Sequence, residues 1–177
     1  TRALASGMRV NEILNTHSTM TDPGTAELAA DAENAVCFDN VTFTYRGAAA
    51  PSLTDISFTA RTGETIGIIG GTGSGKSTLI DLICRFYDAD NGGVTLFDHD
   101  VKQYSFAQLR GLVGIVPQQA VLFTGTIRDN MQWAAPGATD EEIWQALEIA
   151  QAAEFVRGKP GMLDAPVETA GRNFSGG

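Results

Sequence analysis

The sequence predicts an α/β fold, with an early group of strands, a central apolar strand and helices that follow it. Apolar and polar residues alternate in segments 36–45 and 53–61, as in strands with one buried face. The run TIGIIG at 65–70 is rich in β-branched residues and typical of a strand covered on both faces. Apolar residues at three- and four-residue spacing over 76–87 then predict a helix that packs on the sheet.

The first predicted strand carries a change of parity. Val36 and Phe38 occupy even positions, whereas Val41 and Phe43 occupy odd ones. Because successive side chains of a strand point to opposite faces, all four can face the core only if the chain turns or bulges at Asp39-Asn40.

Beyond residue 90, the pattern of apolar residues predicts further strands and helices. We expect a strand over GGVTLF (92–97), a short helix over 106–112, and a strand over GIVPQ (114–118) that Pro117 ends. After Gln118 the pattern becomes helical.

A helix start is indicated by Thr139 followed three residues later by Glu142, which is the spacing of a capping box. An apolar stripe follows that signal. The tail over 161–177 is rich in Gly and without a period, so we expect it to be a loop.

The first 34 residues divide into a helix and a linker. Residues 1–14 place apolar side chains on one stripe and predict a short amphipathic helix. Residues 15–34 mix Pro, Gly, Ser, Thr and acidic residues, as surface linkers do. The folded domain is therefore expected to start near Ala35.

Length and composition exclude several classes of protein. The 177 residues suit one domain with a short appendage, and the net charge of −9 argues against a groove for nucleic acid. Cys37 and Cys84 stand apart without a CxxC pattern, which argues against a disulfide framework or a zinc site and suits a reducing compartment. No apolar run approaches the ~18 residues of a membrane span, so these residues alone are expected to be soluble.

The strongest motif is GGTGSGKST, which fits the pattern GxxxxGK[ST] and follows the apolar run at 65–70. Glycines let the backbone come close to a polyphosphate, and successive N–H groups at a helix start then point toward the anion. Lys76 adds a cation for the outer phosphates, and Ser77 offers a hydroxyl to Mg²⁺. The residues expected to bind nucleotide are Gly70, Gly71, Thr72, Gly73, Ser74, Gly75, Lys76, Ser77 and Thr78.

A calcium loop beginning at Asp88 is a weaker candidate. Asp88, Asp90 and Gly93 fit its spacing, but Gly92 and His99 stand where further oxygen ligands are needed. We therefore interpret this segment as a solvated turn.

Beyond the phosphate motif, the order VTFTY, LTDISF, GETIGIIGGTGSGKSTLI, RFYDADNGGV, VPQQAVLF, TIRDN and GRNFSGG resembles the ATPase domain of ABC transporters of the exporter type. The resemblance covers nearly all of residues 35–177. It implies a P-loop NTPase (RecA-like) core with an antiparallel β subdomain over 35–117, and a Q-loop with a partial helical subdomain over 118–177. Residues 1–14 would be the end of the last transmembrane helix.

The resemblance also implies roles for residues outside the phosphate motif. Tyr45 matches the aromatic residue that stacks on adenine, an interaction worth ~1–3 kcal/mol per base in nucleic-acid systems. Gln118 matches the Q-loop glutamine, which reaches Mg²⁺ and the attacking water, and Gln119 is the alternative if the register slips by one. Residues 174–177 resemble the start of the LSGGQ signature, with Phe174 in place of Leu and without the final residue. In the family this motif meets the γ-phosphate of ATP held by a second ATPase domain. The signature residues are Ser175, Gly176 and Gly177.

The implied reaction is ATP hydrolysis with Mg²⁺, driving export across a membrane. The implied partners are a second ATPase domain, identical or not, and a transmembrane domain preceding residue 1, which together place the domain at the cytoplasmic face of a membrane. In the family the Walker B aspartate, the catalytic glutamate and the switch histidine follow the signature. No apolar run ending in Asp-Glu occurs in these 177 residues, so they are expected to bind ATP without hydrolysing it.

Three alternatives stay open from the residues alone. One is a soluble P-loop enzyme such as a small kinase or GTPase, although no NKxD motif for guanine occurs. Another is an ATP-responsive interaction module with a degenerate site, and the third is an ABC protein without membrane domains.

Overall fold

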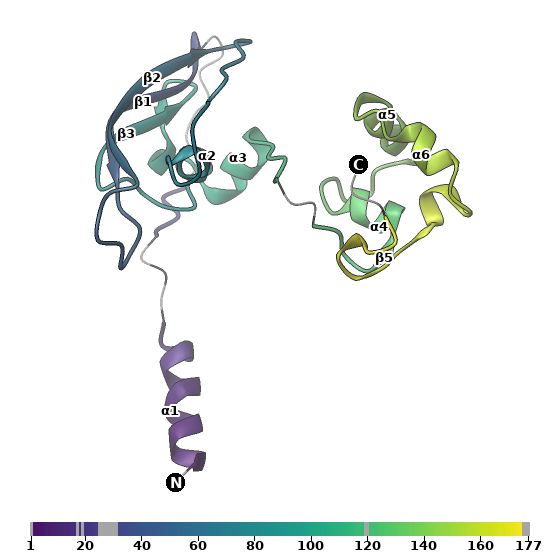
Figure 1. Cartoon of the computed structure of the whole chain (residues 1–177), viewed down its shortest axis with the longest axis horizontal. Coiled ribbons are helices and arrows are strands. Elements are labelled where there is room, and N and C mark those ends of the chain that lie inside the picture. Colours follow the sequence, from purple (N-terminus) through teal and green to yellow (C-terminus); the bar gives the residue numbers. More distant parts are fainter. Residues whose placement is uncertain (1, 17, 19, 25–31, 119–120, 175–177) are drawn as a thin grey trace. The chain divides into compact units, whose positions relative to one another are not determined.

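The computed structural model describes residues 2–16, 18, 20–24, 32–118 and 121–174. The chain divides into two compact units, one formed by residues 1–114 and the other by residues 115–177 (Figure 1).

The predicted N-terminal helix is confirmed as α1 (Arg2–Leu14). Its side chains from residue 6 to residue 14 are exposed, so the apolar stripe is not buried within the first unit. Among the described residues, no helix is both long enough and apolar enough to cross a bilayer.

A four-stranded antiparallel sheet organises the first unit. Its strands are β1 (Asn34–Phe43), β2 (Leu53–Arg61), β3 (Asn91–Leu96) and β4 (His99–Asp100), in the spatial order β2-β1-β3-β4. The strands predicted over 36–45, 53–61 and 92–97 are therefore confirmed, with small shifts of their ends.

The predicted irregularity of β1 is also confirmed. The pairing of β1 with β2 shifts register between Phe38 and Val41, and Asn40 between them has a left-handed φ of 48°. Phe38 and Val41 are exposed by only 1% and 0%, although they lie three positions apart and would point to opposite faces of a regular strand. The bulge thus returns both halves of the strand to the same core.

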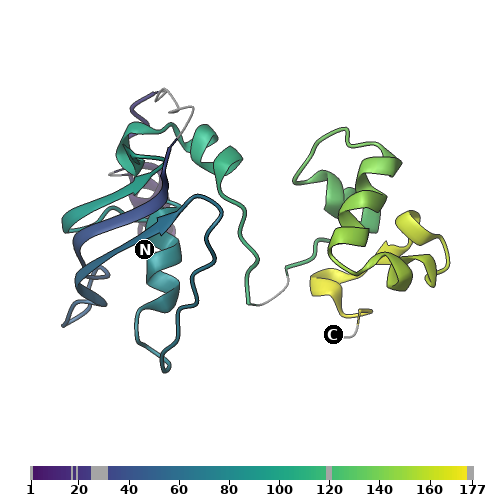
Figure 2. The ribbon, with the colours of Figure 1, turned by 90° about the horizontal axis from the view of Figure 1, so that it is seen from above.

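Helix α2 (Lys76–Ile83) packs against the sheet and supplies its core with two leucines (Figure 2). Leu79 and Leu82 are buried with the apolar face of the sheet and with the segment that leads into α3 (Phe106–Leu112). The prediction that this helix continues to residue 87 is wrong, since Arg85 adopts a left-handed φ of 51° and ends it.

The strands predicted over 65–70 and 114–118 do not form. Both segments are extended, but neither belongs to a sheet, and their residues are exposed. Ile69 is 98% exposed and Val116 97%. A strand of this composition is stable only with hydrogen-bonded neighbours and a cover on each face, and the described residues supply neither to these two segments.

The second unit is built mainly of short helices. It contains β5 (Gly125–Thr126), α4 (Ile127–Gln132), α5 (Asp140–Ile149), α6 (Ala153–Arg157) and β6 (Pro166–Val167). The buried side chains of its core are Ile127, Ile143, Leu147, Ala153, Val156, Leu163, Ala165 and Val167.

Two predictions for the second unit have different outcomes. The capping box is confirmed, because the Glu142 amide donates to the Thr139 hydroxyl and the Thr139 amide donates to the Glu142 carboxylate. The prediction that 161–177 is wholly loop is wrong. A 3₁₀ turn over Met162–Asp164, strand β6 and a second 3₁₀ turn over Thr169–Gly171 occupy part of it, because Leu163, Ala165 and Val167 are buried in the core of this unit.

Candidate nucleotide-binding site

The glycine-rich turn and the first residues of α2 form a backbone cradle. Gly73 and Gly75 both have left-handed φ values, 80° and 85°. Gly75 is the N-cap of α2, and among the described residues no side chain caps this helix start. The amide groups of its first turn are therefore available to an anion, which the helix dipole also favours.

Gly75 is required by packing as well as by its dihedral angles. A Cβ atom at this position would lie 2.7 Å from Leu53 Cδ2 and 2.7 Å from the Ser52 carbonyl oxygen. The cradle therefore lies in close contact with the start of β2, and only glycine fits at position 75.

The Lys76 ammonium group lies inside the cradle. It donates to the carbonyl oxygens of Gly70, at 2.8 Å, and Gly71, at 2.6 Å, and lies 3.2 Å from the Ser74 hydroxyl. A carbonyl oxygen binds an ammonium group less strongly than a phosphate oxygen does. A polyphosphate that enters the cradle can therefore replace the two carbonyl oxygens as the partner of Lys76.

The remaining residues of the motif divide by exposure. Thr72 and Ser77 are exposed, so the hydroxyl of Ser77 is accessible to a hydrated cation. Thr78 is only 4% exposed, so its hydroxyl is not open to solvent as that of Ser77 is. Mg²⁺ prefers oxygen ligands and keeps several waters, so one exposed hydroxyl beside a phosphate site fits its chemistry.

Tyr45, which follows β1, is brought to the same helix. Its phenol oxygen lies 3.1 Å from Thr78 Oγ1 and 3.0 Å from Asp81 Oδ2. Its ring packs edge-on with Phe43 and with Tyr87, at centroid distances of 4.8 and 5.1 Å. Burial is the main cause that raises the pKa of Tyr45 above its ordinary value, so the phenol stays protonated at neutral pH.

Asp81 was not among the residues that the sequence singled out. A weak signal for it existed, since Asp81 follows Thr78 by three residues and a helix therefore places both on one face. Nothing in the sequence indicated that Tyr45 would meet that face, because Thr78 and Asp81 lie 33 and 36 residues further along the chain.

The other predicted site residues belong to the second unit or lie outside the described residues. Gln118 is exposed at the end of the extended segment that begins the second unit. Gln119, Ser175, Gly176 and Gly177 lie outside the described residues. The roles expected for all of them stay predictions.

The segment weighed as a calcium loop uses its carboxylates within the fold. Asp88 pairs with the buried Arg85, whose Nε lies 3.0 Å from Asp88 Oδ1, and Asp90 Oδ2 accepts the Thr44 amide at 2.8 Å. Among the described residues, no group of three His, Cys, Asp or Glu side chains is placed to hold a metal ion.

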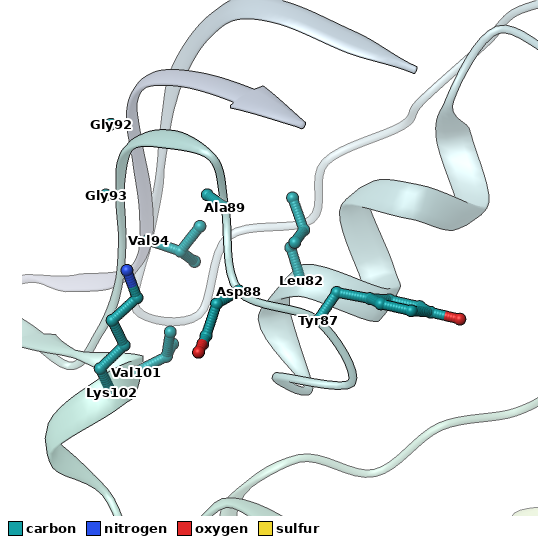
Figure 3. Close-up of a pocket in the computed structure, with 9 residues that line it drawn as sticks. All are labelled: Leu82, Tyr87, Asp88, Ala89, Gly92, Gly93, Val94, Val101 and Lys102. Atoms are coloured by element: carbon teal, nitrogen blue, oxygen red, sulfur yellow. The ribbon is translucent and has the colours of Figure 1, made fainter. Parts of the chain in front are cut away.

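A small cavity beneath the end of α2 is also not the nucleotide site. It lies beside Leu82, Val94 and Val101 and has a volume of about 10 Å³ (Figure 3). This volume is at most that of one water molecule, so the cavity cannot hold a ligand.

Comparison with known proteins identifies the family. The sequence matches the ABC transporter family over residues 53–177. It is 41% identical over 180 residues to an uncharacterised ABC transporter ATP-binding protein of Mycobacterium tuberculosis, covering 99% of this chain and 31% of that protein. It is 39% identical over 176 residues to a multidrug efflux ATP-binding/permease protein of the same species, covering 99% of this chain and 15% of that protein.

A further relative and a solved structure agree with this match. The ATP-dependent lipid A-core flippase of Vibrio cholerae is 42% identical over 139 residues, covering 78% of this chain and 24% of the flippase. A bacterial Atm1-family ABC exporter with ATP bound has a TM-score of 0.87 and 32% identity, covering 99% of this chain and 30% of the exporter chain.

The matched relatives are much longer than this chain. The chain spans less than a third of the length of the relatives it matches. The expected α/β P-loop fold with an antiparallel sheet and helices is confirmed, and so is the resemblance to the ATP-binding domain of exporters. On the family match and the identity over almost its whole length, the chain belongs to the ABC transporter family.

Proposed function

We propose that this chain binds Mg·ATP as the nucleotide-binding part of an exporter. The observation that carries the proposal is the cradle of residues 70–75, with its uncapped helix start and the ammonium group of Lys76 held inside it. Backbone amides and a lysine converging on one concavity form a site for the phosphates of a nucleotide.

Each predicted residue has a place in this proposal. Lys76 contacts the outer phosphates, and Ser77 supplies an oxygen to Mg²⁺. Tyr45 provides a ring for the adenine, and Gln118 reaches Mg²⁺ and the attacking water. The signature residues 175–177 approach the γ-phosphate of ATP bound to a second ATPase domain. Mg²⁺, when bound, neutralises charge on the phosphates, and the residues of the chain position them.

The test of ATP binding is calorimetric titration of the 177-residue protein with Mg·ATP, compared with Lys76→Ala. We expect Lys76→Ala to weaken binding at least about tenfold, because it removes a charge-assisted contact to the phosphates. Lys102→Ala is the matched control, since it removes an exposed cation of the same unit away from the cradle. An absence of binding in the unchanged protein, or equal affinity for Lys76→Ala, would contradict the proposal.

For the parent protein we propose ATP hydrolysis coupled to export, with two ATPase domains pairing beneath transmembrane helices at the cytoplasmic side. The support is that the named relatives are an efflux protein, a flippase and an exporter. Their named cargoes differ, so no cargo is assigned to this chain.

Hydrolysis by the 177 residues alone is not expected. The 177 residues contain no apolar run that ends in Asp-Glu, which is the pattern that carries the water-orienting carboxylate in the family. Phosphate release by the purified protein should therefore stay at the level of Lys76→Ala. Sustained release that depends on Lys76 would contradict this part of the proposal.

A further inference from the structure

The helix that begins at the cradle also carries the two groups that hold the Tyr45 phenol. Thr78 and Asp81 lie three residues apart on α2 and so share one face of it. Thr78 is buried and Asp81 is half-buried, and their side chains lie 3.1 and 3.0 Å from Tyr45 Oη.

The direction of the two hydrogen bonds follows from the number of protons. A phenol has a single proton, and an ionised carboxylate can only accept. Tyr45 therefore donates to Asp81, and the Thr78 hydroxyl donates to the Tyr45 oxygen. Asp81 thus takes the one donor that Tyr45 has, and this bond to a charged acceptor is the stronger of the two.

The ring itself is held from other directions. Phe43 and Tyr87 contact it at interplanar angles of 83° and 89°. These contacts limit the position of the ring, but neither neighbour is polar at the contact, so neither fixes where the phenol oxygen points. The bonds to α2 fix the phenol oxygen, and with it the direction in which the long axis of the ring points.

We propose that Asp81 is a positioning residue for base recognition, because it fixes the Tyr45 ring on the helix that begins at the phosphate cradle. The proposal rests on the proposed function, in which Tyr45 stacks on the adenine. One helix then sets the spacing between the platform for the base and the site for the phosphates. Asp81 acts through Tyr45 and does not contact the nucleotide.

The test compares two ligands, Mg·ATP and inorganic tripolyphosphate with Mg²⁺, because only the first has a base. For Asp81→Ala we expect the affinity for ATP to fall by about three- to tenfold, which is part of the loss expected for a whole stacking contact. The affinity for tripolyphosphate should change by less than about twofold, within the range of small surface effects. Asp81→Asn keeps an acceptor oxygen and should restore most of the affinity for ATP.

Two further variants separate positioning from a loss of structure. Tyr45→Phe keeps the ring without its hydroxyl and should weaken ATP about as much as Asp81→Ala does, and the double variant should weaken it no further. Asp22→Ala is the matched control, since it removes an exposed carboxylate of the same unit and should change neither affinity.

The outcomes distinguish this inference from the proposed function. If Asp81→Ala weakens both ligands equally, or if the losses from Asp81→Ala and Tyr45→Phe add, Asp81 is not a positioning residue for the base. If ATP binding requires Lys76 but is indifferent to Asp81, the inference fails and the proposed function stands. If the unchanged protein binds neither ligand, the proposed function itself fails.

Discussion

At the scale of single residues, Tyr104 shows how a buried polar group is satisfied beneath the sheet. Its side chain is 0% exposed, and its hydroxyl donates to the Leu96 carbonyl oxygen at 2.6 Å. Burial, with a smaller contribution from the charge of Asp98, raises the pKa of Tyr104 above its ordinary value of 10.0. The folded first unit therefore holds the phenolic proton more tightly than the unfolded chain does.

This shift predicts a loss of stability in alkali. The stabilising contribution is fully present below the unfolded pKa of 10.0 and is lost as the pH rises through the higher pKa of the folded state. We expect urea denaturation, followed by tyrosine circular dichroism, to show a steeper fall in stability between about pH 9 and 11 for the unchanged protein than for Tyr104→Phe. Equal falls in the two proteins would contradict the assignment.

Residue patterns predicted the glycine-rich turn and the helix that begins at Lys76, because glycine and lysine at this spacing after an apolar run are typical of a phosphate-binding loop. Asp81 was not predicted because the role proposed for it depends on Tyr45, which contacts it only when the sheet packs on α2. Contacts made by tertiary packing leave no periodic signal in the sequence, so positioning residues are harder to find than the residues they position.

At the scale of elements, α5 is held at its start by the capping box. The backbone amide of Thr139 is the main cause that lowers the pKa of Glu142 below its ordinary value of 4.5, and the Thr139 hydroxyl adds to it. The stabilisation from this carboxylate is present above pH 4.5 and is lost as the pH falls through the lower pKa of the folded state.

Removal of the cap should destabilise the second unit selectively. Thr139→Ala deletes the acceptor for the Glu142 amide and should cost about 1 kcal/mol. Both tryptophans, Trp133 and Trp144, belong to the second unit, so their fluorescence follows its unfolding. Ser105→Ala, which removes the cap of α3 in the first unit, is the matched control and should leave the tryptophan transition unchanged. If the tryptophan transition shifted for Ser105→Ala and not for Thr139→Ala, the prediction that the Thr139 cap stabilises the second unit selectively would be contradicted.

Sequence periodicity correctly predicted the elements whose backbone hydrogen bonds are completed among the described residues, either within a helix or with a paired strand. The bulged β1, its partners β2 and β3 and the capped α5 all belong to this class. The segments 65–70 and 114–118 carried an equally clear strand pattern, yet they lack strand neighbours among the described residues. A β-branched composition indicates a preference for a sheet, but it does not supply the strands beside it.

At the scale of the whole chain, two extended segments with exposed apolar side chains predict self-association of the protein. Ile69 and Val116 are almost fully exposed on backbone whose N–H and C=O groups are free of ladder pairing. Unpaired extended backbone with branched apolar side chains is a template for pairing with another copy.

Sedimentation velocity should therefore show concentration-dependent association of the 177-residue protein. We expect the double variant Ile69→Lys and Val116→Lys to shift the population toward monomer, because charge on an unpaired strand opposes edge-to-edge pairing. Ile149→Lys is the matched control, since Ile149 is 79% exposed but lies at the end of α5. A protein that is monomeric at every concentration, or an equal response to the control variant, would refute this expectation.

The contact of Gly75 with the start of β2 has a mechanical consequence. With no side chain between them, the glycine-rich turn lies in direct contact with the start of the edge strand β2, so movement of one should be transmitted to the other. A ligand that immobilises the turn should also damp fluctuations at Ser52, whose amide bonds to the Phe43 carbonyl oxygen at 2.8 Å. Slower deuterium uptake at the Ser52 amide would then report occupancy of the cradle from a residue outside the glycine-rich turn, directly before β2.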